Sequence, residues 1–297
     1  MIEVKDVVKT FDGFRALDGV TMTVPRGAVY GLVGPNGTGK STLIRHLTGI
    51  YRPDSGAIDI DGQPVYENPA VKARIAYIPD DVFYFPQATI PDMMRYYRGI
   101  YPKFDAERYQ KLGEVFRLDP KRQIRRLSKG MQKQAAFWLA MSLRPDVLIL
   151  DEPVDGLDPV MRRQVWNLVL ADVAENGTTV LISSHNLREL EDVCDHVGIM
   201  NGGKILLEHP LAELQANIVK VFVALPDEAR LPEGLDILHR SAQGHLHTLI
   251  VHGDAAEVMN RLSTAQPQYL DVVPLTLEEI FIYELGGADY AVKDILL

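Results

Sequence analysis

Residues 28–42 decide the fold, and they read Ala28-Val29-Tyr30-Gly31-Leu32-Val33-Gly34-Pro35-Asn36-Gly37-Thr38-Gly39-Lys40-Ser41-Thr42. The apolar run 28–33 is typical of a buried strand. After the glycine-rich segment, apolar residues recur at helical spacing, at Leu43, Ile44, Leu47 and Ile50. The stretch therefore predicts a strand, a glycine loop and a helix in direct succession.

The loop carries the pattern Gly34-x-x-x-x-Gly39-Lys40-Ser41, which is the Walker A phosphate-binding motif. Its glycines let consecutive backbone N–H groups turn toward one anionic centre, and the helix that follows adds the partial positive charge of its N-terminus. Lys40 supplies a mobile charge for the β- and γ-phosphates of a bound nucleotide, and the Ser41 hydroxyl can ligate Mg²⁺. The expected nucleotide-binding residues here are Gly34, Asn36, Gly37, Thr38, Gly39, Lys40, Ser41 and Thr42.

A second motif follows the apolar run 147–150, which ends in Asp151 and Glu152. A buried strand ending in two carboxylates suits metal-assisted phosphoryl transfer. Asp151 then reaches the Mg²⁺ ion, and Glu152 activates the water that attacks the γ-phosphate. Alone, such a strand end is common and solvated, but the Walker A pattern in the same chain favours the catalytic interpretation.

The rest of the chain supports an α/β fold. Strand signals at 147–150, 178–183 and 197–200 alternate with helical stretches, which predicts a mainly parallel sheet. Residues 2–8 and 19–24 predict a pair of strands joined by a turn at Asp12-Gly13. After Pro210 the pattern changes to strands at 218–224, 247–252 and 269–273, an N-capped helix over 254–262, and a last helix from Thr276.

Three further motifs carry a resemblance to a known family. Leu127-Ser128-Lys129-Gly130-Met131 resembles the signature motif LSGGQ, the segment 155–158 resembles the D-loop, and His185 resembles the H-loop histidine. Over roughly residues 1–225, the chain is similar to the ATP-binding subunits (nucleotide-binding domains) of bacterial ABC transporters. The segments 101–105 and 276–281 are most similar to the Ytr-like, bacitracin-resistance-type exporter ATPases.

The resemblance implies a P-loop NTPase core of the ABC type. Such a core has a mainly parallel sheet, an N-terminal antiparallel β subdomain and a helical subdomain, followed here by a small C-terminal α/β domain. The expected boundaries are 1–215 for the ATPase domain, about 81–145 for the helical subdomain within it, and 216–297 for the accessory domain.

The resemblance also implies a head-to-tail dimer, in which ATP held by one copy is covered by the signature motif of a second ATPase subunit, identical or not. Ser128 and the backbone at Gly130 would complete the phosphate site, and His185 would contact the γ-phosphate. Asp158 would lie at the dimer seam. Phe11 stands where an aromatic stacks on adenine, although a packed aromatic at a strand end is the alternative.

Two positions depart from the family pattern. Asp80 stands where the Q-loop glutamine is expected; a carboxylate can still accept a hydrogen bond from a Mg²⁺-bound water, but it is shorter and charged. In the signature, Lys129 and Met131 replace the usual glycine and glutamine. The roles expected of Ser128 and Gly130 need only a hydroxyl and backbone freedom, so these roles are retained.

Charge and hydropathy limit the kinds of molecule that can be partners of this chain. The net charge is -9, and residues 211–297 hold 5 basic against 13 acidic side chains. Nucleic acid is therefore a poor candidate partner, because neither residues 1–210 nor residues 211–297 carry a net positive charge. No apolar window reaches the length of a membrane span, and the N-terminus lacks a signal pattern, so we expect a cytoplasmic subunit held at the inner face of the cell membrane by a transmembrane permease.

Two other function classes compete with a transport motor that powers export. One is a soluble ABC ATPase that acts in translation or on nucleic acid, and the other is a regulatory cassette that does not hydrolyse ATP. A single cassette without a heptad run argues against the first, and the presence of Lys40, Asp151, Glu152 and His185 argues against the second. The aromatic residues at 83–85, 96–97 and 101 form either a permease docking groove or a local core.

Overall fold

A computed structural model gives the fold of residues 1–226, 231–232 and 234–285. The chain divides into two compact units. Unit 1 comprises Met1–Asn186 and Val193–Glu208, and unit 2 comprises Leu187–Asp192 and His209–Leu297. The part of the expected accessory domain at 227–230, 233 and 286–297 lies outside the described residues.

Unit 1 begins with an antiparallel sheet whose strand order is β2-β1-β4-β5. The strands are β1 (Ile2–Phe11), β2 (Phe14–Val24), β4 (Ser55–Ile60) and β5 (Gln63–Pro64). Asp12 and Gly13 both have positive φ, 46° and 83°, which matches the twist that a two-residue hairpin turn needs. The two predicted strands are confirmed, and each extends to this turn.

The second sheet of unit 1 has six strands in the order β10-β9-β3-β8-β7-β6. These are β3 (Val29–Val33), β6 (Ile75–Ile78), β7 (Val147–Asp151), β8 (Thr179–Ser184), β9 (His196–Asn201) and β10 (Lys204–Pro210). The pairs β9/β3, β3/β8, β8/β7 and β7/β6 are parallel. The carboxyl ends of β3, β7 and β8 therefore lie at one edge, where polar residues follow each apolar strand.

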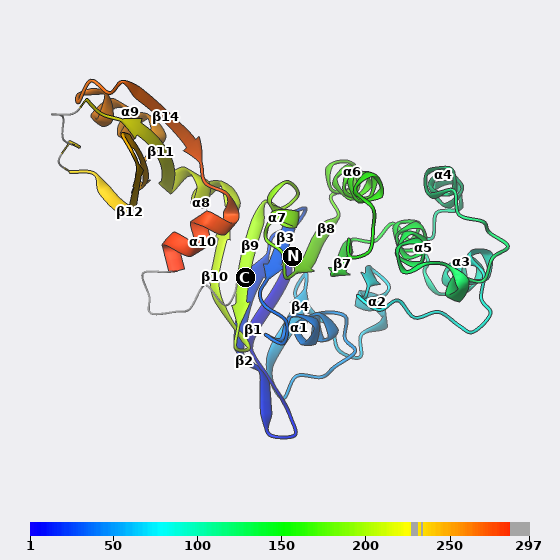
Figure 1. Ribbon diagram of the computed structural model, residues 1–297. Helices are drawn as coiled ribbons and strands as arrows, with labels where there is room; N and C mark the ends of the chain where they lie inside the picture. The colour runs from blue at the N-terminus through cyan, green and yellow to red at the C-terminus, as the bar shows by residue number, and fades with distance from the viewer. Residues whose placement is uncertain (227–230, 233, 286–297) are drawn as a thin grey trace. The chain divides into compact units, whose positions relative to one another are not determined.

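Helix α1 (Lys40–Leu47) links the two sheets of unit 1. Leu43, Ile44 and Leu47 on its apolar face are fully buried in a cluster that also contains residues of β1, β2, β3 and β7. Burying each such side chain contributes about 1.5–3 kcal/mol. The helix that starts at the glycine loop is thus anchored in the main core, and Figure 1 shows it next to the strands of unit 1.

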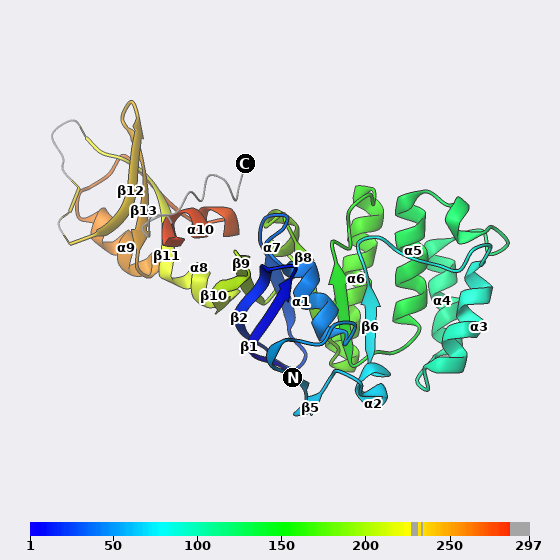
Figure 2. The same cartoon turned by 90° about the horizontal axis from the view of Figure 1, so that it is seen from below.

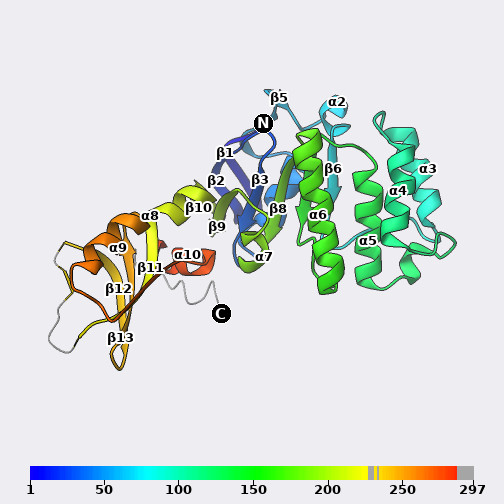
Figure 3. The ribbon, with the colours of Figure 1, turned by 90° about the horizontal axis from the view of Figure 1, so that it is seen from above.

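A group of helices lies beside β6. It comprises α3 (Ile90–Ile100), α4 (Ala106–Phe116), the 3₁₀ turn η1 (Ile124–Arg126) and α5 (Lys129–Met141). Trp138 of α5 stacks on Tyr109 of α4 at 4.9 Å and donates to its carbonyl at 2.7 Å. Figures 2 and 3 show these helices side by side, beyond β6 and away from α1. The short α2 (Pro69–Lys72) and the long α6 (Pro159–Asn176) complete unit 1.

Unit 2 contains an antiparallel sheet of order β12-β13-β11-β14 within the described residues. Its strands are β11 (Ile218–Ala224), β12 (Asp236–Gln243), β13 (Leu246–His252) and β14 (Tyr269–Pro274), and its helices are α7 (Arg188–Glu191), α8 (Leu211–Asn217), α9 (Ala255–Ser263) and α10 (Leu277–Leu285). Val221, Leu249 and Val251 pack against Val258 and Leu262 of α9 to form a separate core.

The predicted capping box of the last helix is present. The Thr276 hydroxyl accepts from the Glu279 N–H at 3.2 Å, and the Glu279 carboxylate accepts from the Thr276 N–H at 3.1 Å. Among the helices of the described segments, none combines the length and the apolar character needed to cross a bilayer.

Candidate nucleotide site

Sterics require glycine at two positions of the loop between β3 and α1. A Cβ at Gly34 would lie 2.1 Å from the Met200 carbonyl oxygen, and a Cβ at Gly39 would lie 2.6 Å from that of Ala16. Gly39 also has a φ of 107°, which side chains rarely adopt. The loop can therefore keep this shape, with its backbone pressed against neighbouring strands, only with glycine at both positions.

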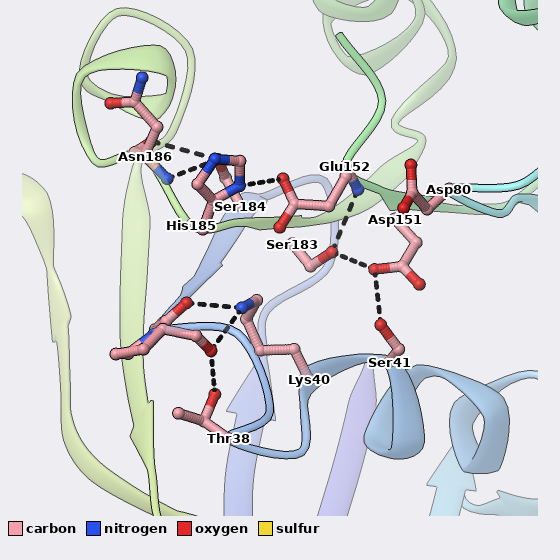
Figure 4. A network of polar contacts seen from close by, with 12 residues as sticks. Thr38, Lys40, Ser41, Asp80, Asp151, Glu152, Ser183, Ser184, His185 and Asn186 are labelled. Atoms are coloured by element: carbon pink, nitrogen blue, oxygen red, sulfur yellow. Dashed lines mark hydrogen bonds and ion pairs between the residues drawn. The ribbon is translucent and has the colours of Figure 1, made fainter. Parts of the chain in front are cut away.

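Lys40 is the first residue of α1, and its side chain folds back over the loop (Figure 4). Its Nζ donates to the carbonyl oxygens of Gly34 at 2.5 Å and Pro35 at 3.0 Å. Thr38 donates to the same Pro35 oxygen at 2.9 Å. Burial lowers the pKa of Lys40, and the charges of Glu152 and Asp151 oppose this shift. The described hydrogen bonds of this ammonium go to neutral oxygens, so an anion in the loop would find a cation already in place.

Asp151 ends β7 and is buried beside the start of α1. Its Oδ1 accepts from the Ser183 hydroxyl at 2.5 Å and lies 3.3 Å from Ser41 Oγ. Ser183, on β8, is a residue that the motif search missed, and the only signal for it is a hydroxyl at the end of an apolar strand. Carboxylate and hydroxyl oxygens are the ligands that Mg²⁺ prefers, so Asp151 and Ser41 fit this ion.

Glu152 follows directly and has an unusual backbone, with a φ of 46°. Its N–H lies 3.2 Å from both the carbonyl and the hydroxyl oxygen of Ser183. The side chain is 11% exposed, and its Oε2 lies 2.9 Å from Nδ1 of His185. Because an ionised carboxylate only accepts, the hydrogen of this bond belongs to the histidine.

The electrostatics of Glu152 favour a base. Burial raises the pKa of its carboxyl group, while the hydrogen bond from His185 and the charges of His185 and Lys40 lower it. The nearby charge of Asp155 raises it further. One side-chain atom from each of Glu152, Asp155 and His185 lies within 4.8 Å of the other two. Asp155, in the D-loop, therefore belongs to this cluster, although the sequence analysis did not predict it as a site residue.

The predicted signature residues lie elsewhere, at the start of α5. Ser128 caps the helix by accepting from the Met131 N–H at 3.3 Å. A Cβ on Gly130 would lie 2.5 Å from the Gly156 carbonyl oxygen, so glycine is required where α5 meets the D-loop. Asp158 caps α6, accepting from Val160 N and Met161 N at 3.0 Å each. These three residues are thus grouped around the D-loop.

Asp80, which follows β6, lies between the two groups. Its side chain is more than half exposed and pairs with Lys133 of α5 at 3.3 Å. A cavity of about 400 Å³ separates this loop from the signature helix and the D-loop, and it is lined by Asp80, Asp81, Val82, Lys129, Gln132, Lys133, Asp155 and Gly156. Asp80 therefore lies beside the carboxyl end of β7, near Asp151 and Glu152 (Figure 4).

Phe11 is 38% exposed at the end of β1. Its ring meets the edge of Tyr51 at 5.6 Å, and Tyr51 in turn meets His46 of α1. The ring is therefore partly exposed and is connected through Tyr51 to the helix that carries Lys40.

The aromatic residues of the helical group divide between the two interpretations. Tyr84 is buried and belongs to the core, whereas Phe83, Phe85 and Tyr96 are exposed. Phe85 and Tyr96 pack edge to face at 5.0 Å. A docking role is thus open only to the exposed rings.

Comparison with known proteins identifies close relatives. A sequence profile of the family described as "ABC transporter" matches residues 17–155. The Bacillus subtilis ABC transporter ATP-binding protein YtrB is 32% identical over 97% of this chain and 99% of its own length. The Streptomyces peucetius daunorubicin/doxorubicin resistance ATP-binding protein DrrA is 35% identical over 73% of this chain and 67% of its own length. A solved structure of the ATP-binding subunit of an ABC transporter has a TM-score of 0.67 and 30% identity, covering 72% of this chain and 92% of that one.

Proposed function

The chain belongs to the ATP-binding subunits of ABC transporters, of the Ytr-like type, and from this we propose that two such subunits close over two ATP molecules to power export through a separate permease. Like its family, the chain is an ATPase. One observation supports the residue roles proposed here. A group of polar contacts at the carboxyl ends of β3, β7 and β8 brings together Lys40, Ser41, Asp151, Glu152 and His185.

The chain's own residues divide the work of holding the substrate. The loop N–H groups and Lys40 bind the β- and γ-phosphates, and the exposed ring of Phe11 stacks on the adenine. Ser41 and Asp151 hold Mg²⁺, for which Asp80 is an outer partner. When bound, this ion neutralises charge on the phosphate oxygens.

Glu152 accepts the proton of the attacking water at its carboxylate. Burial keeps the carboxylate basic, and the hydrogen bond from His185 Nδ1 fixes its orientation. His185, which is half-exposed, also faces the space where the γ-phosphate lies in this proposal. The two residues thus orient the water and register the presence of the phosphate together.

Ser128 and Gly130 serve a second copy. Within one chain they lie at the start of α5, where Gly130 meets the D-loop at Gly156 and Ser128 caps the helix, and none of their described contacts reaches the chain's own glycine loop. The N–H groups that open α5, with the Ser128 hydroxyl, would instead complete the phosphate site of the partner, with Asp158 at the seam.

Export through a membrane partner is supported by the relatives. DrrA is named for drug resistance and YtrB for an ABC transporter. We assign permease docking to the exposed rings of Phe83, Phe85 and Tyr96, which would hold the subunit at the inner face of the cell membrane. A role on nucleic acid is not favoured, because the chain carries a net charge of -9.

Glu152→Gln tests this function. The amide cannot accept the water's proton, so the steady-state rate should fall by about 10²–10⁴-fold. ATP should remain bound and should hold a dimer that is visible by sedimentation. The matched control Glu107→Gln changes a carboxylate exposed on α4 and should leave the rate unchanged. Wild-type turnover by Glu152→Gln would refute Glu152 as the base.

A further inference from the structure

Lys133 is a buried lysine that none of the nucleotide motifs accounts for. Its side chain is only 5% exposed, although lysine is almost never buried unless it is paired. It lies on α5, one turn and a half after Ser128, and points from the signature helix toward the end of β7. A charge in this position needs partners that offset its loss of water.

Two groups supply that compensation, and both belong to the nucleotide site. Lys133 Nζ donates to the backbone carbonyl of Glu152, and it also lies 3.3 Å from Asp80 Oδ1. One ammonium thus joins the signature helix, the loop after β6 and the strand end that carries the base. The pairing also accounts for a carboxylate at position 80, because a neutral side chain there would leave the lysine without a counter-charge.

The carbonyl contact has a particular consequence because the backbone of Glu152 is left-handed, with a φ of 46°. A residue other than glycine keeps this conformation only when its surroundings hold it there. Ser183 holds the N–H of Glu152 and Lys133 holds the carbonyl. Together they fix the direction in which the carboxylate leaves the backbone, toward His185.

We propose that Lys133 is a positioning residue for ATP hydrolysis, which sets the backbone of Glu152 through its carbonyl and holds Asp80 against the same strand end. This inference rests on the proposed role of Glu152 as the base. The hydrogen bonds described for Lys133 go to Asp80 and the Glu152 carbonyl, so we expect it to act on turnover and not on ATP affinity.

The test is the steady-state ATPase of the full-length chain with Lys133→Met, which keeps the length of the side chain and removes its charge and donors. We expect kcat to fall by about ten- to a hundredfold, because misplacing a reacting group by about 1 Å has an effect of this size. KM for ATP should stay within about threefold of wild type, because uniform substrate binding is untouched. Lys111→Gln, which changes a lysine exposed on α4, should leave both constants unchanged.

A second variant shows whether Lys133 acts through Asp80. Adding Asp80→Asn to Lys133→Met removes the carboxylate that the first change leaves without its cation, but it does not return a donor to the Glu152 carbonyl, so the double variant should stay impaired at least as much as Lys133→Met. A merely structural lysine would show parallel losses of kcat, ATP affinity and melting temperature. If Lys133→Met does not fold, Lys133→Gln, which keeps a donor, is measured in the same way with Asp80→Asn.

The inference is overturned if the Lys133 variant turns over ATP within twofold of wild type, or if KM rises as much as kcat falls. A double variant restored to within twofold of wild type overturns it as well, because the loss would then come from the unpaired charge of Asp80 and not from the Glu152 carbonyl. Glu152→Gln separates this from the proposed function. If Glu152→Gln is inactive and Lys133→Met is not impaired, only the positioning role fails; if Glu152→Gln turns over normally, the proposed function fails first.

Discussion

Asp155 offers a way to change the basicity of Glu152 without touching either partner of its hydrogen bond. Burial is the main cause that raises the pKa of Glu152, and the charge of Asp155 adds to it. A base with a raised pKa is protonated, and lost, as the pH falls through that value. Asp155→Asn should therefore move the acidic limb of the kcat profile to lower pH, because it removes one of the causes that raise this pKa.

The measurement is kcat at saturating ATP across the acidic range, with Glu107→Gln as the control that should leave the limb in place. An acidic limb that stays fixed or moves to higher pH in Asp155→Asn would show that Glu152 is not the group that titrates.

At the scale of residues, the sequence predicts the contiguous parts of the site better than the contacts between them. Lys40, Ser41, Asp151 and Glu152 are recognisable because the chemistry of a loop or a strand end lies within a few neighbouring positions. Ser183 and Lys133 reach Asp151 and Glu152 across strands and from another helix. No local pattern marks such pairs, since they depend on strand order and on the depth at which α5 packs.

At the scale of elements, the glycine loop is set by sterics that two matched variants can separate. Gly37 has a φ of 83° and open space where a Cβ would lie, so Gly37→Ala should cost about 1–2 kcal/mol of backbone strain alone. Gly39→Ala adds a clash with the Ala16 carbonyl and should lower the melting temperature and the ATP affinity considerably more. Equal effects of the two variants on both quantities would contradict this origin of the loop's shape.

The sequence predicts helices and strands correctly where the burial of one face gives the apolar residues a regular spacing. The predicted strands at 2–8, 147–150 and 218–224 are confirmed, because alternating or continuous apolar residues mark them. Strand β12 was not predicted, because its residues are largely exposed and polar at the edge of the sheet. Its pairing with β13, from Asp236 opposite His252 to Gln243 opposite Leu246, depends on a neighbour that a short window does not see.

At the scale of the whole molecule, unit 2 includes a short segment, Leu187–Asp192, that begins two residues after His185. Helix α7 belongs to unit 2, where Arg188 pairs with Glu278 at 2.8 Å and Glu191 accepts from the Leu277 N–H at 3.1 Å. We expect a change in this segment to reach His185 along the chain and so to alter hydrolysis. Glu278→Lys should lower kcat about two- to tenfold, a range typical of couplings through packed elements.

The control for that variant is Glu257→Lys, which makes the same charge reversal on an exposed pair of α9. ATP turnover should distinguish the two variants while their melting temperatures stay similar. If Glu278→Lys and Glu257→Lys have the same kcat, unit 2 does not influence hydrolysis through this segment.

The claim on which the account depends most is that each ATP is held by Lys40 of one copy and Ser128 of another. Its most direct test is the ATPase activity of an equimolar mixture of full-length Lys40→Ala and Ser128→Asp chains. Aspartate keeps the cap of α5 but places a negative charge against the phosphate, so each variant alone should be inactive. In the mixture, half of the dimers contain one intact site, and activity should recover to about a quarter of wild type. A mixture no more active than its two components would contradict the account.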